Sequence, residues 1–344
     1  MGDGRPRRAV SGAGGASEEQ ARREHYGDFY GLHDGGLGRA DAIALVSGNC
    51  QAESLRVMLD GGGLQTVRIP PVHELTADDL PHLDQWLGRA RLLVSQPVRD
   101  DYRGLPLGIR QLSARLGPDA STVAVPVIRF AGLYPWHAII RPPSDTSLVP
   151  PLVAYHDLRV LAEAAGLGSP SGLTVAMVRA IADDSRAELV RREVQHDTVR
   201  ISDLFDRPRF AQMRTLNHPG NVVFEALAER VRSRAGLPEH EPRFERPLLN
   251  SVHAPREAAV LEAWGLDPED DPIAVPIAVP IADPIADAAA PAGATSGQWI
   301  VDGRAVSVET VREAHLAWYA EHPDAVAAGL TRHRRALDHL GIRA

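Results

Sequence analysis

The sequence contains no lysine and only one cysteine; all 37 of its cationic residues are arginine. Without lysine the chain can have no phosphate-binding loop of the Walker type, which needs that residue. It also has no lysine to form a Schiff base with pyridoxal phosphate or a carbonyl substrate. With one cysteine it can form no intramolecular disulfide, which fits a reducing compartment, and we expect a cytoplasmic protein.

Long apolar runs and a positive charge balance are lacking as well. No stretch approaches the ~20 apolar residues of a membrane span, and residues 1–23 contain arginines but no apolar core of a secretory signal. The net charge of −8 argues against a nucleic-acid partner. No HExxH, CxxC or paired-histidine spacing is present, so we expect no metal. Hydrophobic residues still make up 44% of the 344 residues, enough for a substantial core.

The composition predicts four segments along the chain. Residues 1–38 are rich in Gly, Ser, Ala and Arg and predict a disordered arm, although the aromatic stretch at 24–33 could instead dock on the body. Residues 39–265 predict an α/β domain. Residues 266–297 contain a Pro-Ile-Ala repeat and predict an extended linker, because proline blocks helices and central strands. Residues 298–344 predict a helical segment that either packs on the body or serves a homo-oligomer.

Short apolar runs alternate with helical patterns between residues 42 and 130. The runs predict strands at 42–47, 64–70, 91–96 and 121–130, and the patterns between them predict helices in 51–63, 76–90 and 104–117. This alternation indicates a parallel sheet with helices on both faces, the three-layer arrangement of SGNH hydrolases. Further helical patterns lie at 147–166, 173–197 and 218–236. The expected fold is therefore α/β, followed by a mainly helical second half.

The only cysteine lies in the stretch Gly-Asn-Cys-Gln at 48–51, directly after the first predicted strand. Ligands of open α/β sheets bind beyond the carboxyl ends of the strands. The N-terminus of the following helix would favour a thiolate at Cys50. Gly48 allows a close approach, and the amides of Asn49 and Gln51 can donate to an oxyanion. The alternative is a small buried residue, because free cysteine is often buried. We predict that Cys50 is a nucleophile.

A cysteine nucleophile needs a base, usually a histidine. His218 is the best placed of the 14 histidines. Asn217 or Thr215 can cap a helix that begins at Pro219, which would fix His218 on a rigid corner where Asn217 could orient the ring. His156 is the second candidate. For both histidines the alternative is a residue without chemistry, at a helix entry for His218 and on a helix surface for His156.

Two further loops follow predicted strands and lie at the same edge of the sheet. In the loop 94–108, Gln96 is a candidate positioning residue and an arginine can bind phosphate with two hydrogen bonds. In the loop 129–141, aromatic rings either wall an adenine or a sugar or fill the core. The candidate ligand-binding residues of these loops are Arg99, Tyr102, Arg103, Tyr134, Trp136 and Arg141.

Five stretches in this order, SGNCQAESL, SQPVRDDYRGLPLG, VPVIRFAGLYPW, AYHDL and TLNHPGNVVFEAL, resemble the WcbI family of polysaccharide biosynthesis enzymes. The resemblance covers roughly residues 42–240. It implies a coenzyme A-dependent acetyltransferase, with acetyl-CoA as the donor and a hydroxyl of a capsular or other surface sugar as the acceptor. It also implies a protease-like pair of a cysteine and a histidine, which here are Cys50 and His218.

Two other functions remain open from the sequence. An esterase or hydrolase of the SGNH type places a serine after the first strand and a late histidine in an Asp-x-x-His motif. Here Cys50 stands in the position of the serine, and His218 follows Arg-Thr-Leu-Asn instead. The third possibility is a non-catalytic nucleotide- or carbohydrate-binding module. Retention of coenzyme A by the purified protein would favour the acetyltransferase over the hydrolase.

Overall fold

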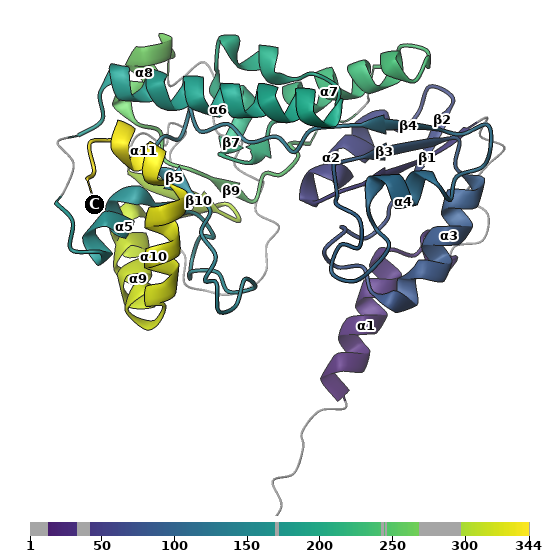
Figure 1. Cartoon of the computed structure of the whole chain (residues 1–344), viewed down its shortest axis with the longest axis horizontal. Coiled ribbons are helices and arrows are strands. Elements are labelled where there is room, and N and C mark those ends of the chain that lie inside the picture. Colours follow the sequence, from purple (N-terminus) through teal and green to yellow (C-terminus); the bar gives the residue numbers. More distant parts are fainter. Residues whose placement is uncertain are drawn as a thin grey trace, which may run out of the picture. The chain divides into compact units, whose positions relative to one another are not determined.

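The computed structural model describes residues 13–32, 42–168, 172–241, 244, 246–267 and 297–343. The chain divides into two compact units (Figure 1). Unit 1 comprises Met1–Val123 and Arg232–Pro242, and unit 2 comprises Ala124–Val231 and Arg243–Ala344. Residues 39–265 are shared between the two units, and the C-terminal segment belongs to unit 2. The expected linker lies almost entirely outside the described residues.

Unit 1 is built on a four-stranded sheet in the order β2-β1-β3-β4. Its strands are β1 (Ala42–Ser47), β2 (Leu64–Val67), β3 (Leu92–Ser95) and β4 (Ser121–Ala124). Strand β1 pairs in parallel with both β2 and β3. All four residues of β3 are buried, which is why its sequence is a continuous apolar run rather than an alternating one. The expected parallel sheet is confirmed, but β4 ends at Ala124 instead of 130.

The helices of unit 1 follow its strands as predicted, with one shorter than expected. Helix α2 (Cys50–Leu59) contacts β1 and β2, and α3 (Leu80–Arg89) follows the short 3-10 helix η1 (Ala77–Asp79) and contacts β1. Helix α4 spans only Ile109–Ser113. Gly104, the first residue of the expected range 104–117, has a positive φ angle, so the helix cannot begin there.

Residues 13–32 belong to the folded part of unit 1, so the expectation of a disordered arm is wrong for this segment. They form α1 (Ala13–His25) and a turn whose rings Tyr26, Phe29 and Tyr30 are buried in the unit 1 core. The indole N–H of Trp86 donates to the carbonyl of Phe29 at 3.0 Å. The aromatic stretch at 24–33 therefore docks. The remaining residues of the expected arm lie outside the described part of the chain.

Unit 2 combines helices with three small sheets, which confirms a mainly helical second half. Strands β5 and β6 pair with each other, as do β7 and β8, and β11-β10-β9 form a three-stranded antiparallel sheet. Helix α7 (Asn221–Arg234) begins in unit 2, and its residues from Arg232 onward belong to unit 1. The strands are β5 (His137–Ala138), β6 (His156–Asp157), β7 (Met213–Thr215), β8 (His218–Pro219), β9 (Val252–His253), β10 (Gln298–Val301) and β11 (Arg304–Ser307). The helices are α5 (Leu158–Ala164), α6 (Val175–His196), η2 (Ser202–Asp206), η3 (Phe210–Gln212), α7 (Asn221–Arg234), α8 (Ala258–Trp264), α9 (Val308–Glu321), α10 (Pro323–Arg332) and α11 (Arg334–His339).

Three expected element boundaries are wrong in unit 2. The helix expected from 147 begins only at Leu158, where Asp157 caps it by accepting from the backbone N–H of Arg159. The helix expected from Pro219 begins at Asn221, and Pro219 lies in β8. The C-terminal segment opens with the hairpin β10–β11 rather than a helix.

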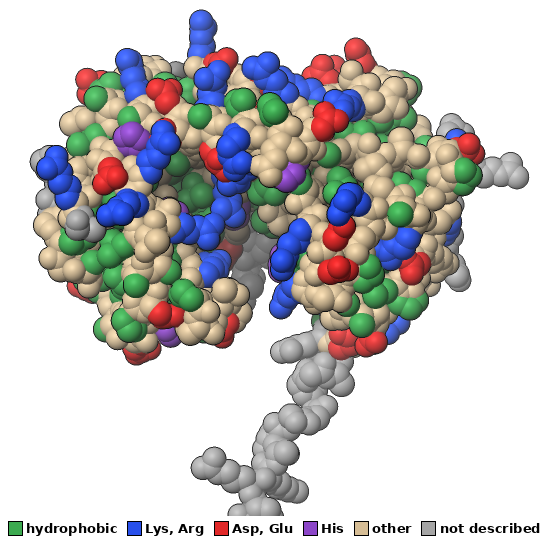
Figure 2. Space-filling model, in the orientation of Figure 1, with side chains coloured by type: hydrophobic (Ala, Val, Ile, Leu, Met, Phe, Trp, Pro, Cys, Tyr) green, Lys and Arg blue, Asp and Glu red, His purple; other side chains and the backbone are tan. Residues whose placement is uncertain are grey.

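The surface in Figure 2 shows arginine and acidic side chains interspersed over the visible face. Among the described residues, no helix is both long and apolar enough to cross a membrane.

Candidate functional site

The turn after β1, residues 48–51, holds Cys50 at the first position of α2. Asn49 caps the helix, because its Oδ1 accepts from the backbone N–H of Gln51 at 2.9 Å. The thiol is exposed. It therefore lies at the positive end of a helix and at the carboxyl edge of a parallel sheet, as the sequence predicts. Both features favour its thiolate form.

Gln96, the residue directly after β3, holds this turn in place. Its Oε1 accepts from the backbone N–H of Asn49 at 2.9 Å, and its Nε2 donates to Oε1 of Gln51 at 3.3 Å. The Gln96 backbone N–H donates to the carbonyl of Ser47 at 2.9 Å. Gln51 and Gln96 are both buried. Their side chains therefore hold the turn in shape, and their role as positioning residues stays a prediction.

Gly48 is required by the closeness of Gln96. A Cβ atom at this position would lie 2.5 Å from Oε1 of Gln96. That is far inside van der Waals contact, and the atom concerned is the acceptor of the hydrogen bond to Asn49. Only glycine allows the backbone to approach the Gln96 amide this closely.

The loop after β3 presents Arg103 on the surface of unit 1. Arg103 has a left-handed φ of 55° and donates from Nη1 to the carbonyl of His73 at 2.6 Å. This contact uses one of its five N–H donors. Tyr102 is half-buried and packs against the unit 1 core. Of these two candidate ligand-binding residues, Arg103 is thus the more exposed.

In unit 2, His218 begins β8, the second strand of a short hairpin with β7. Its Nδ1 is buried, and no hydrogen-bond partner for it lies among the described residues. Burial lowers the pKa of His218 to about 4, and the nearby charge of Arg214 adds to this. The imidazole is therefore neutral at pH 7, the form in which a histidine can accept a proton. Gly220, directly after β8, lets the backbone pack closely on Ala211, since a Cβ there would lie 2.0 Å from the carbonyl oxygen of Ala211.

Tyr155 is a neighbour of His218 that sequence reasoning missed. Its ring meets the imidazole edge-to-face with centroids 5.8 Å apart. Its hydroxyl donates to Oδ1 of Asn217 at 2.8 Å and accepts from Oγ1 of Thr215 at 2.9 Å. Asn217 therefore holds the Tyr155 ring that packs against His218, and its role toward His218 stays a prediction. Tyr155 also stacks on Trp299 with centroids 5.9 Å apart.

Three predicted site residues are enclosed in the interior of unit 2. Tyr134 is 3% exposed and donates its hydroxyl to the carbonyl of Met213 at 2.8 Å, and Trp136 is 2% exposed. His156 is 0% exposed, and its ring nitrogens contact the hydroxyl of Tyr319 at 2.5 Å and the carbonyl of Ile140 at 3.1 Å. The structure thus favours the core-filling alternative for both aromatic rings. The alternative interpretation of His156, a position on a helix surface, is wrong.

The predicted site residues fall in both units. Gly48, Asn49, Cys50, Gln51, Gln96, Tyr102 and Arg103 belong to unit 1, and Tyr134, Trp136, Asn217 and His218 belong to unit 2. The pairing of Cys50 with His218 stays a prediction. In the described part of the chain, no group of three or more His, Cys, Asp or Glu residues is arranged to hold a metal ion.

Comparison with known proteins shows what this chain is similar to. Residues 43–240, more than half of the chain, match the family model described as the polysaccharide biosynthesis enzyme WcbI. A solved structure of WcbI, described as a novel polysaccharide biosynthesis enzyme in its native form without a disulfide bond between COA and a cysteine, superposes with a TM-score of 0.61 at 18% identity. The alignment covers 87% of this chain and 99% of that chain, and it shows a shared fold. No curated protein matches.

Proposed function

Because this chain belongs to the WcbI family of polysaccharide biosynthesis enzymes, we propose that it is a cytoplasmic, coenzyme A-dependent O-acetyltransferase that acts on a sugar hydroxyl. In this proposal Cys50 is the nucleophile and His218 the base. The observation that carries it is the position of the only thiol of the chain, exposed on the first residue of α2 at the sheet edge. The solved relative, a native form without a disulfide bond between COA and a cysteine, supports a cysteine that can lie beside the sulfur of the cofactor.

Coenzyme A, bound as its acetyl thioester, supplies an activated acyl group. The turn 48–51 presents the Cys50 thiol at the helix N-terminus, where positive potential favours the thiolate. Gln96 and Asn49 keep that turn in one shape through their hydrogen bond, so little reorganisation precedes attack. Because the chain has no lysine, arginines or backbone N–H groups must hold the phosphates of the donor. Arg103, exposed at the same sheet edge, is our candidate for this role.

The proposed reaction has two steps. The Cys50 Sγ forms a bond to the acyl carbon while the bond from that carbon to the donor sulfur breaks, and His218 passes the thiol proton to the departing thiolate. The acceptor hydroxyl then attacks the acyl-cysteine, His218 takes the hydroxyl proton, and the Cys50 thiolate leaves and recovers that proton. Burial keeps His218 neutral at pH 7. An adjacent anion, such as the Cys50 thiolate, would raise its pKa and strengthen it as a base.

Acylation in the absence of acceptor tests the proposal. Incubation of the full chain with acetyl-CoA should give a protein heavier by one acetyl group, located by mass spectrometry on the peptide that contains Cys50. Cys50→Ala should abolish both the adduct and the transfer. His218→Ala should slow acylation by the ~10²–10⁴-fold of a lost general base. The matched control is His196→Ala at the exposed end of α6, which should acylate normally.

Three outcomes would contradict parts of this mechanism. Normal transfer by Cys50→Ala together with lost transfer by His218→Ala would mean direct transfer from the donor to the acceptor. An adduct that is lost to water as fast as to any hydroxyl would mean a hydrolase. No adduct and no retained coenzyme A would leave only a binding module.

A further inference from the structure

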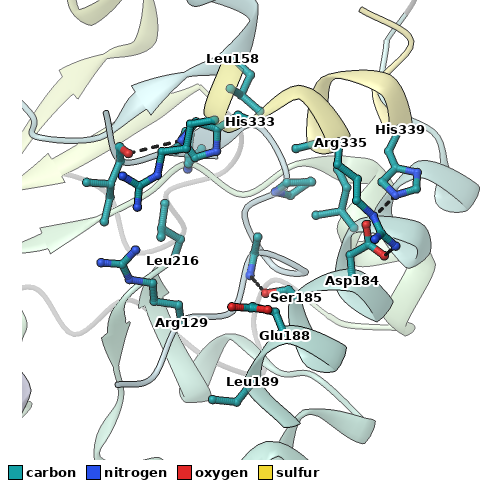
Figure 3. Close-up of a pocket in the computed structure, with 18 of the residues that line it drawn as sticks. Arg129, Leu158, Asp184, Ser185, Glu188, Leu189, Leu216, His333, Arg335 and His339 are labelled. Carbon is teal, nitrogen blue, oxygen red and sulfur yellow. Dashed lines mark hydrogen bonds and ion pairs between the residues drawn. The ribbon is translucent and has the colours of Figure 1, made fainter. Parts of the chain in front are cut away.

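Unit 2 contains a cavity of about 340 Å³ that is open to solvent and plays no part in the site described above. Figure 3 shows Arg129, Leu216 and His333 on one side of it, Asp184, Arg335 and His339 on the other, and Ser185 and Glu188 between them. The segment after β4, helix α6 and helices α10 and α11 supply most of its walls. Every lining residue belongs to unit 2.

Arginines outnumber carboxylates in the lining of this cavity. Its charged residues, apart from histidines, are Arg129, Arg192, Arg332, Arg335, Asp184 and Glu188. Four guanidinium groups face two carboxylates, which leaves an excess of two positive charges. A cavity lined in this way attracts an anion, and a doubly charged one would balance it.

Both carboxylates are already paired with cations. Asp184 forms ion pairs with Arg335 and with Nε2 of His339, the latter at 2.8 Å. Glu188 accepts from Nε of Arg192 at 2.6 Å and from Nε of Arg191 at 2.7 Å. The partners of the two carboxylates therefore lie on α11 and α6. Arg129 has no acidic partner among the described residues.

Arg129 itself has unmet hydrogen-bonding capacity. Its Nε is buried and has no hydrogen-bond partner among the described residues. Burial lowers the pKa of Arg129, and the like charges of Arg192 and Arg332 lower it further. A partly buried cation that faces other cations is costly unless an anion joins it.

Two more polar residues belong to the lining. His137 lines the cavity, and its buried Nδ1 has no hydrogen-bond partner within the described residues. Ser185 accepts from the backbone N–H of Ala131 at 3.0 Å through Oγ, so its own hydroxyl hydrogen can donate elsewhere. Apolar side chains complete the walls, among them Leu158, Ile181, Leu189 and Leu216.

We propose that this cavity binds a phosphate monoester, with Arg129 as the principal ligand of the phosphoryl group and Arg332 and Arg192 beside it. A phosphate monoester carries close to two negative charges at pH 7, which matches the excess of the lining. A guanidinium group can hold two phosphoryl oxygens at once. The apolar walls and the cavity volume leave room for the carbon skeleton attached to the phosphate. Binding here does not require acyl transfer at Cys50.

Two kinds of ligand carry this chemistry, the 3′-phosphate of coenzyme A and a phosphorylated sugar. Calorimetry on the full chain with inorganic phosphate, adenosine 3′,5′-bisphosphate and glucose 1-phosphate distinguishes them. We expect inorganic phosphate to bind and one of the two monoesters to bind more tightly. The adenosine compound as the tighter ligand would identify the coenzyme, and glucose 1-phosphate would identify a sugar phosphate.

Arg129→Gln should weaken phosphate binding by about 10–150-fold, the effect of losing a hydrogen bond to a charged group. Arg332→Gln, on the exposed side of the cavity, should also weaken phosphate binding. This variant replaces Arg129→Gln in the test if Arg129→Gln does not fold. The control is Arg312→Gln, which removes an exposed arginine paired with Glu163 outside the cavity and should bind normally. Absence of phosphate binding at millimolar concentration, or equal binding by wild type and both cavity variants, would overturn the proposal.

The thermal stability of Arg129→Gln supplies a second readout. If Arg129 serves to bind a ligand, the substitution removes its repulsion with Arg192 and Arg332. The melting temperature of the variant without phosphate should then equal or exceed that of the wild type. Added phosphate should then raise the melting temperature of the wild type but not of the variant. A lower melting temperature for the variant, with phosphate stabilising both proteins equally, would show that Arg129 serves only the fold.

Discussion

At the scale of single residues, the geometry around Cys50 depends on an amide that is far away in the sequence. Gln96 lies 47 residues after Asn49 and holds its backbone N–H. Gly48 leaves the space that this amide occupies. The nucleophile that we propose is therefore positioned by residues that have no chemistry of their own.

Gly48→Ala tests this positioning. The added Cβ would collide with Oε1 of Gln96, so the Gln96 side chain must leave and the hydrogen bond to Asn49 must break. We expect acylation of Cys50 to fall by about 10²-fold or more, because misplacement of a nucleophile by about 1 Å has that cost. Gly88→Ala on α3 is the matched control, since nothing lies within 4 Å of a Cβ there. Equal acylation rates in both variants would show that the turn tolerates movement.

The sequence predicts a good part of this residue-scale arrangement. The turn chemistry places Cys50 at a helix start, and the Asn49 cap follows from local propensity. Tyr155 could have been found from its place in the AYHDL stretch beside His156, yet nothing local shows that it packs on His218. The burial of Tyr134 and Trp136 depends on contacts with distant segments of unit 2, which no local pattern reveals.

At the scale of elements, α1 and the turn after it are held to unit 1 by a buried carboxylate. Asp79 accepts from Nη2 of Arg22 at 2.8 Å and from the hydroxyl of Tyr30 at 2.6 Å. Its Oδ2 also accepts from the backbone N–H of Thr76 at 2.9 Å. Burial alone would raise the pKa of Asp79, but these donors lower it to about 2. One residue thus caps a helix and anchors the N-terminal segment.

Asp79→Asn should loosen that segment. The depressed pKa means that the carboxylate stabilises the folded state above about pH 4 and that this contribution is lost as the pH falls toward 2. At pH 7 we expect a loss of roughly 1–2 kcal/mol after allowance for screening. Hydrogen exchange in the peptide 19–32 should therefore be about 5–30-fold faster. The neighbouring Asp78→Asn, at an exposed position, should leave exchange unchanged, and equal rates in both variants would contradict the anchor.

The strands of unit 1 are predictable because buried parallel strands leave continuous apolar runs in the sequence. The sequence also contains a turn signal for the hairpin β10–β11. Asp302 and Gly303 join its strands with φ angles of 47° and 79°, and Asp-Gly between two apolar runs is a strong indicator of such a turn. The aromatic rings at 24–33 raise the possibility of docking, but composition could not decide it, because the arginines and glycines around them indicate disorder.

At the scale of the whole molecule, the chain leaves unit 1 after Val123 and returns to it at Arg232. Arg232 is 1% exposed, and its guanidinium group donates to the carbonyls of Leu59, Gly61 and Gly62 at 3.1, 3.2 and 2.8 Å. A single arginine therefore ties the returning segment to the end of α2. The sequence could not predict this return, because the contacts span at least 170 residues and a buried arginine has no distinct local pattern.

Histidines also divide unevenly between the units. Among the described residues, six have a pKa lowered by burial, and all six lie in unit 2. They are His137, His156, His218, His253, His315 and His333. Each is neutral in the folded state at a pH where the unfolded chain would bind a proton. Acid should therefore unfold unit 2 through these residues.

The pH window follows from the pKa values. Three of these histidines, His137, His218 and His253, have a folded pKa of about 4 against 6.5 in the unfolded chain. The unfolded state binds more protons below pH 6.5, so the free energy of unfolding falls as the pH drops from 6.5 toward 4. At pH 5.5 each would cost roughly 1.4 kcal/mol, and three such costs are a large part of the ~5–15 kcal/mol of a typical domain.

We predict that peptides of unit 2 lose hydrogen-exchange protection between pH 6.5 and 5 while those of the unit 1 sheet keep theirs. His137→Phe keeps an aromatic ring against Trp299, removes one proton-binding site and removes an unpaired buried nitrogen. It should therefore shift the loss of protection in unit 2 to lower pH. His196→Phe, at the exposed end of α6, should not. If both units lost protection together, and His137→Phe unfolded at the same pH as the wild type, the buried histidines would not govern the acid stability of this protein.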